Sequence, residues 1–181
     1  LAGGTGDIAK LLASKIGKNG QLILSDYNQK MLKEGRDRLI DLGINNISYA
    51  QIDAQFLPFK KDSFDLITIA FGLRNFADKE LSLKSIYQCL KPGGSLMVLE
   101  FSKPKNEILN ELYDLYSFEV IPIIGSIVTN SAESYRYLAE SIRMHPDQEE
   151  LKKMFETSGF SDCSYENLTN GIVAIHRGFK K

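Results

Sequence analysis

Two glycines and two aspartates are spaced as they would be in a site for an adenosine-containing ligand. The chain opens on Leu1-Ala-Gly-Gly-Thr-Gly-Asp7, and glycine lets backbone N–H groups approach a ligand where a Cβ would clash. The start of a following helix would favour polar or anionic groups there. Asp26 comes 20 residues after Gly6, at the end of a predicted strand, where a carboxylate can accept from both ribose hydroxyls. Asp53, at the end of the next predicted strand, would lie beside the adenine amine.

The same residues leave two cofactors open. Gly4-x-Gly6-x-x-Ala9 followed by Asp26 also satisfies the dinucleotide fingerprint, so an NAD-dependent oxidoreductase is one hypothesis. The Asp53-Ala54 pair and the strand led by Ser63-Phe-Asp65 favour S-adenosylmethionine instead.

Alternating strands and helices must position these residues. Such alternation predicts an α/β fold with a Rossmann-like, doubly wound and mainly parallel sheet. The tail predicts two strands joined through Asn170-Gly171, hence an antiparallel C-terminal strand. We expect one domain over residues 1–181, N-terminally incomplete, because a ligand-binding glycine loop normally follows a strand. The predicted helices lie near 8–16, 31–43, 78–90 and 147–158, and the strands near 21–25, 46–51, 63–71, 95–101, 163–168 and 172–176.

The regular alternation of strands and helices is interrupted over residues 104–145. A connection this long is usually a functional cover or carries structure of its own, so we expect a helical insertion there that covers the substrate. Apolar spacing predicts one of its helices around Tyr135–Ile142.

Charge and composition exclude several classes of protein. The chain has 22 Lys+Arg and 23 Asp+Glu, a balance that offers no footprint for nucleic acid. The run from Val120 to Val128, broken by Pro122 and Gly125, is far shorter than the roughly 20 residues of a spanning helix. Cys89 and Cys163 lack metal-binding spacing and are expected to be small apolar groups in a reducing compartment. No metal site is predicted.

Several further motifs carry a resemblance to known proteins. The sequence resembles class I S-adenosylmethionine-dependent methyltransferases, although Ala2 stands where their loop usually has glycine. More narrowly, it is similar to the ubiquinone/menaquinone biosynthesis C-methyltransferase (UbiE/MenG) family. The motifs that carry this similarity are Leu1–Asp7, Ile69–Asn75, Leu90–Ser102, Ser134–Ile142, Met144–Gln148 and Ala174–Gly178.

The resemblance implies methyl transfer from S-adenosylmethionine to a ring carbon of a polyprenyl benzoquinol or of demethylmenaquinol. A non-catalytic S-adenosylmethionine-binding subunit of a quinone-synthesis complex is the remaining alternative. Ala70 occupies a cofactor position that is often serine in the family. The implied cofactor residues are Gly3, Gly4, Thr5, Gly6, Asp26, Asp53, Ala54 and Ala70.

Methylation of a ring carbon needs an ionised neighbouring hydroxyl, since a phenolate pushes charge onto its ortho carbon. A phenol with a pKa near 10 needs help at neutral pH. We expect Arg74 to stabilise the phenolate and Asn75 to hydrogen-bond the quinol oxygen, with water relaying the proton. A structural ion pair is the alternative for Arg74. His145 is a second catalytic candidate, because a histidine can act as a base near neutral pH. The alternative is that its side chain only packs where the chain enters the next helix.

The expected partners follow from the apolar polyprenyl chain of the substrate. Tyr135, Arg136 and Tyr137 are expected to contribute to substrate binding. Segment 104–145 has three basic residues, Lys105, Arg136 and Arg143, against six acidic ones. This favours transient apolar contact with a membrane over an electrostatic anchor. We expect a cytoplasmic enzyme, peripheral at most at the inner membrane, with a homodimer or a quinone-synthesis complex left open.

Overall fold

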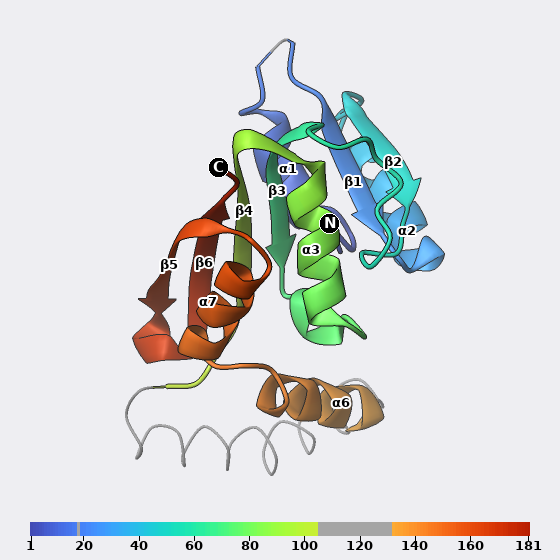
Figure 1. Ribbon diagram of the computed structural model, residues 1–181. Helices are drawn as coiled ribbons and strands as arrows, with labels where there is room; N and C mark the ends of the chain where they lie inside the picture. The colour runs from blue at the N-terminus through green and yellow to red at the C-terminus, as the bar shows by residue number, and fades with distance from the viewer. Residues whose placement is uncertain (18, 105–131) are drawn as a thin grey trace.

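Parallel strands form the centre of the molecule. The computed structural model describes residues 1–17, 19–104 and 132–181 (Figure 1). One sheet pairs β1 with β2, and a second has the order β3-β4-β6-β5. Both β1/β2 and β3/β4 are parallel, whereas β6 is antiparallel to both β4 and β5. The strands are β1 (Leu22–Asp26), β2 (Ile47–Gln51), β3 (Phe64–Ala70), β4 (Leu90–Phe101), β5 (Ser161–Leu168) and β6 (Val173–Phe179).

The predicted α/β class, the mainly parallel strands and the antiparallel C-terminal strand are therefore confirmed. One detail differs, because β1 and β3 are not paired with each other in the described chain. A groove of about 510 Å³ lies between them. At one end the Leu1 amino group donates to the Thr68 carbonyl at 2.9 Å, and Gly3 N donates to Ser25 O at 2.9 Å. The first residues thus lie between the carboxyl-terminal parts of both strands.

Helices cover both sides of the strands, with α1 and α2 behind them and α3 and α7 in front (Figure 1). Their starts follow the sequence signals. Asn28 and Asp78 cap α2 and α3 by accepting from backbone N–H groups, and Asp147 with Glu150 forms the predicted capping box of α7. The helices are α1 (Asp7–Ala13), α2 (Gln29–Asp41), α3 (Lys79–Cys89), α6 (Ala132–Arg143) and α7 (Gln148–Thr157).

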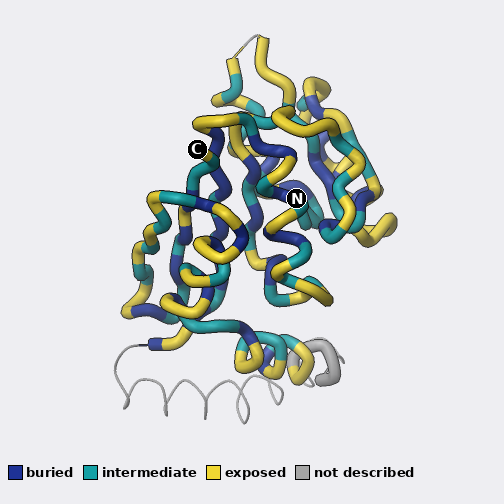
Figure 2. Tube along the Cα trace, viewed as in Figure 1, coloured by how far each residue is buried: buried dark blue, intermediate teal, exposed yellow. Residues whose placement is uncertain are grey.

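Two apolar cores hold these layers together. The larger is formed by β3 and β4 with α3 and α7, and includes Leu83, Val98 and Phe155, each fully buried. The smaller joins β1 and β2 to α1 and α2 through residues such as Leu24 and Leu39. Figure 2 shows the buried positions concentrated along the strands and the inner sides of these helices.

Gln148, the first residue of α7, links the ends of three strands. Its side chain is buried and donates to Lys103 O at 2.9 Å, Asn167 Oδ1 at 3.0 Å and Gly171 O at 3.3 Å. Its own carbonyl lies 2.9 Å from Nε2 of His176 in β6. The start of α7 is therefore fixed where the chain leaves β4 and where β5 turns into β6.

The expected insertion is described only in part. Helix α6 confirms the helix predicted around 135–142, and it lies beyond the ends of β3 and β4 (Figure 1). Residues 105–131, which include most of the expected substrate cover, lie outside the described residues. No helix in the described ranges has the length and apolarity to cross a membrane. Both cysteines are free, and burial raises the pKa of Cys89 and raises that of Cys163 to about 11.

Candidate cofactor and substrate site

The glycine loop connects the groove to α1 and packs tightly on α2. Gly4 and Gly6 have φ values of +50° and +85°, a conformation that favours glycine. A Cβ on Gly6 would meet Leu39 Cδ1 at 2.7 Å, and a Cβ on Gly35 would meet the Gly4 carbonyl at 2.7 Å. Gly35 lies inside α2, where glycine costs about 1 kcal/mol relative to alanine. A glycine within a predicted helix is the one sequence signal for this close packing, and Gly35 is not among the residues predicted above.

Asp26 holds the loop from the end of β1. Its Oδ2 accepts from Gly4 N at 2.9 Å and its Oδ1 accepts from Asn28 N at 2.8 Å. A carboxylate has about four acceptor positions, so two remain for the hydroxyls of a ligand. Asp26 thus ties the glycine loop to the edge of the ligand site.

Asp53 and Ala54 follow β2 at the same edge. Asp53 Oδ1 accepts from Gln55 N at 2.9 Å, and the Gln55 side-chain amide lies 3.3 Å from it. Ala54 is buried. The sequence prediction that the two aspartates follow neighbouring strands is confirmed, since β1 and β2 pair with Asp26 opposite Gln51.

A cavity of about 920 Å³ connects the loop, the two aspartates and the end of β3. Its lining, as far as the chain is described, includes Asp7, Asp26 and Asp53 but no lysine, arginine or histidine. Asp7 lies in the first turn of the seven-residue α1 and pairs with Arg38 at 2.8 Å. A carboxylate in the first turn is stabilised by the helix dipole and, here, also by Arg38. The carboxylates make this lining acidic, which suits a ligand that carries a positive charge.

The end of β3 forms the opposite wall. Ala70, Phe71, Gly72 and Asn75 line the cavity. Asn75 Oδ1 accepts from the hydroxyl of Tyr137 in α6 at 3.1 Å, which leaves the amide N–H groups of Asn75 as donors to a ligand. A Cβ on Gly72 would lie 2.5 Å from that of Ala2, so this turn packs on the glycine loop.

Arg74 lies behind that wall and is not among the residues that line the cavity. Its Nη1 lies 2.9 Å from Oε1 of Glu100 and also donates to the Phe71 carbonyl. Glu100 is 1% exposed and further accepts from the backbone N–H groups of Phe101 and Arg74. The structural ion pair, which is the alternative role given for Arg74 from the sequence, is present in the structure. The partner could not be found from spacing, since Glu100 is 26 residues away.

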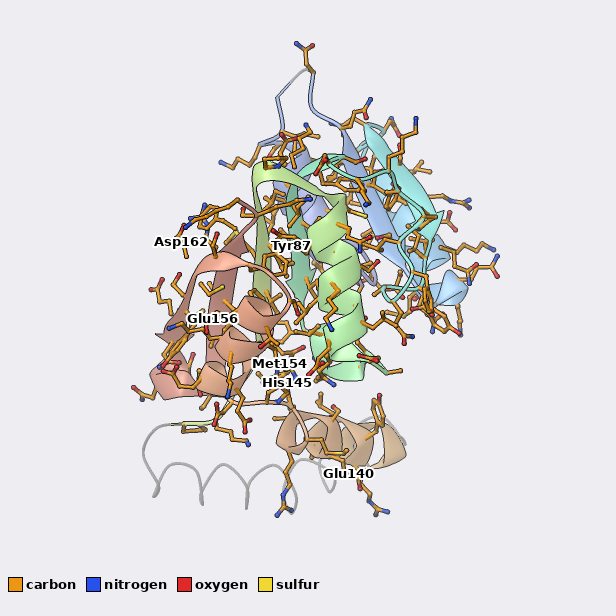
Figure 3. All side chains as sticks on the ribbon, in the orientation of Figure 1. Tyr87, Glu140, His145, Met154, Glu156 and Asp162 are labelled. Atoms are coloured by element: carbon orange, nitrogen blue, oxygen red, sulfur yellow. The ribbon has the colours of Figure 1, made fainter. Side chains whose placement is uncertain are left out.

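His145 lies where α6 leads into α7, on the α6 side of α3 (Figure 3). It is buried, and neither ring nitrogen has a hydrogen-bond partner among the described residues. Burial, reinforced by the positive charges of Lys79, His176, Arg74 and Lys103, lowers the pKa of His145 to about 3. The imidazole is neutral at physiological pH, and such a weak base cannot readily take a phenolic proton.

The three residues of α6 that are predicted to bind the substrate differ in how they relate to the cavity. Tyr137 reaches Asn75, as above, and is 57% exposed. Arg136 is exposed and is not among the described residues that line the cavity. The side chain of Tyr135 lies outside the described part of the chain. Phe71, which lines the cavity, was not singled out from the sequence.

Comparison with known proteins places this geometry in a family. Residues 1–180 match the model of the ubiE/COQ5 methyltransferase family. The chain is 58% identical to the ubiquinone/menaquinone biosynthesis C-methyltransferase UbiE of Teredinibacter turnerae, across 99% of this chain and 73% of that protein. It is 59% identical to the protein of the same name from Pseudoalteromonas translucida, across 99% and 72%.

Solved structures show the same fold at low identity. A SAM-dependent methyltransferase from Aquifex aeolicus superposes with a TM-score of 0.72 at 14% identity, over 98% of this chain and 79% of that one. Phosphoethanolamine N-methyltransferase 2 of Haemonchus contortus, solved with S-adenosyl-L-methionine, gives 0.71 at 16%, over 99% and 47%. The [4+2]-cyclase SpnF gives 0.72 at 16%, over 99% and 72%. The fold alone therefore does not fix the reaction.

Proposed function

Because the chain belongs to the ubiE/COQ5 methyltransferase family, we propose that it methylates a ring carbon of a polyprenyl benzoquinol, of demethylmenaquinol, or of both. The enzyme is an S-adenosylmethionine-dependent C-methyltransferase of ubiquinone and menaquinone biosynthesis. The lining of the cavity supports the following assignment of residues to the cofactor and the quinol.

The cofactor fits the residues that line the cavity. S-Adenosylmethionine supplies an electrophilic methyl group on a positively charged sulfur. Asp26 has acceptor positions for ribose hydroxyls, and Asp53 with Ala54 would hold the adenine. Gly3, Gly4 and Thr5 would let the amino-acid part approach the backbone, and Ala70 would contact it through backbone atoms only. Gly6, which is not among the lining residues, would act by letting the loop pack on Leu39. The acidic lining is the observation that carries the proposal, because carboxylates stabilise the positive charge of a sulfonium ligand.

The quinol would lie at the β3 end of the cavity. Asn75 would donate to the quinol oxygen through its amide, with Tyr137 holding the amide carbonyl. Arg74 would act mainly by fixing Phe71, since Glu100 and the Phe71 carbonyl already occupy its Nη1. Water in the cavity would receive the phenolic proton. His145 would then be a packing residue with a neutral ring.

Product analysis tests the proposal. The chain is incubated with methyl-labelled S-adenosylmethionine and a short-chain quinol of each class, and S-adenosylmethionine and NAD are titrated separately. We expect a ring-methylated product and binding of S-adenosylmethionine but not of NAD. Tight NAD binding without S-adenosylmethionine binding would refute the cofactor assignment, and binding without a product would leave only a non-catalytic subunit.

The cellular setting is part of the proposal. The polyprenyl substrate partitions into bilayers, so a cytoplasmic enzyme would need transient contact with the inner membrane or with a quinone-synthesis complex. Co-sedimentation with vesicles that contain the quinol, compared with vesicles that lack it, tests the first of these routes. The oligomeric state, including a homodimer, is measured in the same preparation by light scattering.

A further inference from the structure

Phe71 has a backbone conformation that is unusual for its side chain. Its φ is +54°, in a region where a bulky residue is a genuine outlier. Among the described non-glycine residues with positive φ, only Ala2 and Phe71 line the cavity. Residues in such conformations persist only where their surroundings hold them, and they cluster at ligand-binding sites.

Three groups hold the Phe71 backbone in place. Its N–H donates to Leu99 O at 2.8 Å, and its carbonyl accepts from Arg74 Nη1. Arg74 is in turn fixed by Glu100 at 2.9 Å. The buried ion pair therefore stabilises an otherwise unfavourable backbone conformation of Phe71 in the wall of the cavity.

The Phe71 ring is supported from behind. Its centroid lies 4.8 Å from that of Phe101, with the ring planes at 48°. The Arg74 guanidinium lies 5.4 Å from the Phe101 centroid. Phe71 is still 37% exposed, although a large apolar side chain would normally be covered.

We propose that Phe71 is the residue against which the quinol ring stacks, and that it contributes to the choice between benzoquinol and naphthoquinol. This inference rests on the proposed function. Stacked rings gain affinity in proportion to the face they share. A demethylmenaquinol has two fused rings and a benzoquinol has one, so Phe71 should favour the larger ring.

Initial-rate kinetics on Phe71→Leu and Phe71→Tyr test the proposal. Leucine keeps an apolar side chain and removes the ring, whereas tyrosine keeps the ring. The rates are measured at saturating S-adenosylmethionine with one short-chain quinol of each class, and S-adenosylhomocysteine binding is measured by calorimetry. We expect Phe71→Leu to raise the KM for quinol about two- to tenfold, more for the naphthoquinol than for the benzoquinol. The calorimetric Kd and kcat should change less than twofold, and Phe71→Tyr should resemble the parent chain.

Each other outcome counts against the inference. An unchanged KM in Phe71→Leu, an equal rise for both quinols, or an equal loss in Phe71→Tyr would overturn it. A weakened S-adenosylhomocysteine Kd with an unchanged quinol KM would place Phe71 in the cofactor site instead. If Phe71→Leu does not fold, Phe71→Met gives the same comparison. A parent chain that binds S-adenosylmethionine but methylates neither quinol would refute the proposed function, and the inference with it.

Discussion

Removing Arg74 is expected to destabilise the whole fold, because Glu100 would keep a charge in the interior. Glu100 is 1% exposed and the Arg74 side chain 12%. Breaking a buried ion pair by removing one partner costs about 3–5 kcal/mol. Two backbone donors stay on Glu100, Phe101 N at 2.9 Å and Arg74 N at 3.2 Å, so the lower end applies. We expect Arg74→Ala to lose about 3 kcal/mol, or roughly 6–12 °C in Tm for a chain of this size.

Urea unfolding of four proteins measures this loss. They are the parent chain, Arg74→Ala, Glu100→Gln and the double variant. Glu100→Gln keeps the shape and removes the charge, so the double variant should be more stable than the sum of the single effects predicts, by about 0.5–3 kcal/mol. A loss below about 1 kcal/mol in Arg74→Ala, together with additive effects, would refute the reasoning.

Activity of the same variants separates the two roles of Arg74. If Arg74 acts by fixing Phe71, Glu100→Gln should raise the KM for quinol in the same direction as Arg74→Ala, because both changes weaken the support of Phe71. If the guanidinium faces the phenolate directly, as expected from the sequence, Glu100→Gln should retain most of the activity, since the positive charge remains.

Three further perturbations follow from the described contacts. Asp26→Ala should weaken S-adenosylmethionine binding by tenfold or more, since a charge-assisted hydrogen bond contributes about 1.5–3 kcal/mol; calorimetry measures it against Asp37→Ala, an exposed acid outside the cavity. Asp147→Ala should lower the free energy of unfolding by about 1 kcal/mol through loss of the α7 capping box, and Asp147→Ser, which keeps an acceptor, should recover most of it in a thermal melt. The pKa of His145 is about 3 in the folded chain and near 6.5 when unfolded, so the unfolded state takes up the proton first and stability falls as the pH drops from 6.5 toward 3. Between pH 6.5 and 5 the loss should be about 2 kcal/mol, and His145→Phe should lack it in urea unfolding; equal pH dependence in both proteins would show that the ring is not buried as described.

The edge of the sheet that carries the glycine loop and the two aspartates could be predicted from the sequence because it depends on local signals. Glycines, strand ends and caps act within a few residues of themselves, so Gly4, Asp26 and Asp53 fall at the same edge once the strands are parallel. The capping box of α7 follows for the same reason.

The surroundings of Arg74, Phe71 and His145 could not be predicted in this way. The role of Arg74 depends on Glu100 in the next strand, and the conformation of Phe71 depends on both Arg74 and Phe101. The pKa of His145 depends on burial and on charges from four other segments. These are tertiary effects, and residue type and spacing do not encode them.

The contacts of Gln148 bear on how much the chain between β4 and α7 can vary. Its amide bonds the Lys103 carbonyl where the chain leaves β4, and it begins α7 where the chain returns. Both ends of the intervening stretch are thus anchored at one point of the scaffold. The entropy of closing a loop grows only logarithmically with its length, so that stretch could be lengthened, shortened or exchanged with little effect on the sheet. Sequence changes between Lys103 and Gln148 would then leave the glycine loop, Asp26 and Asp53 in place.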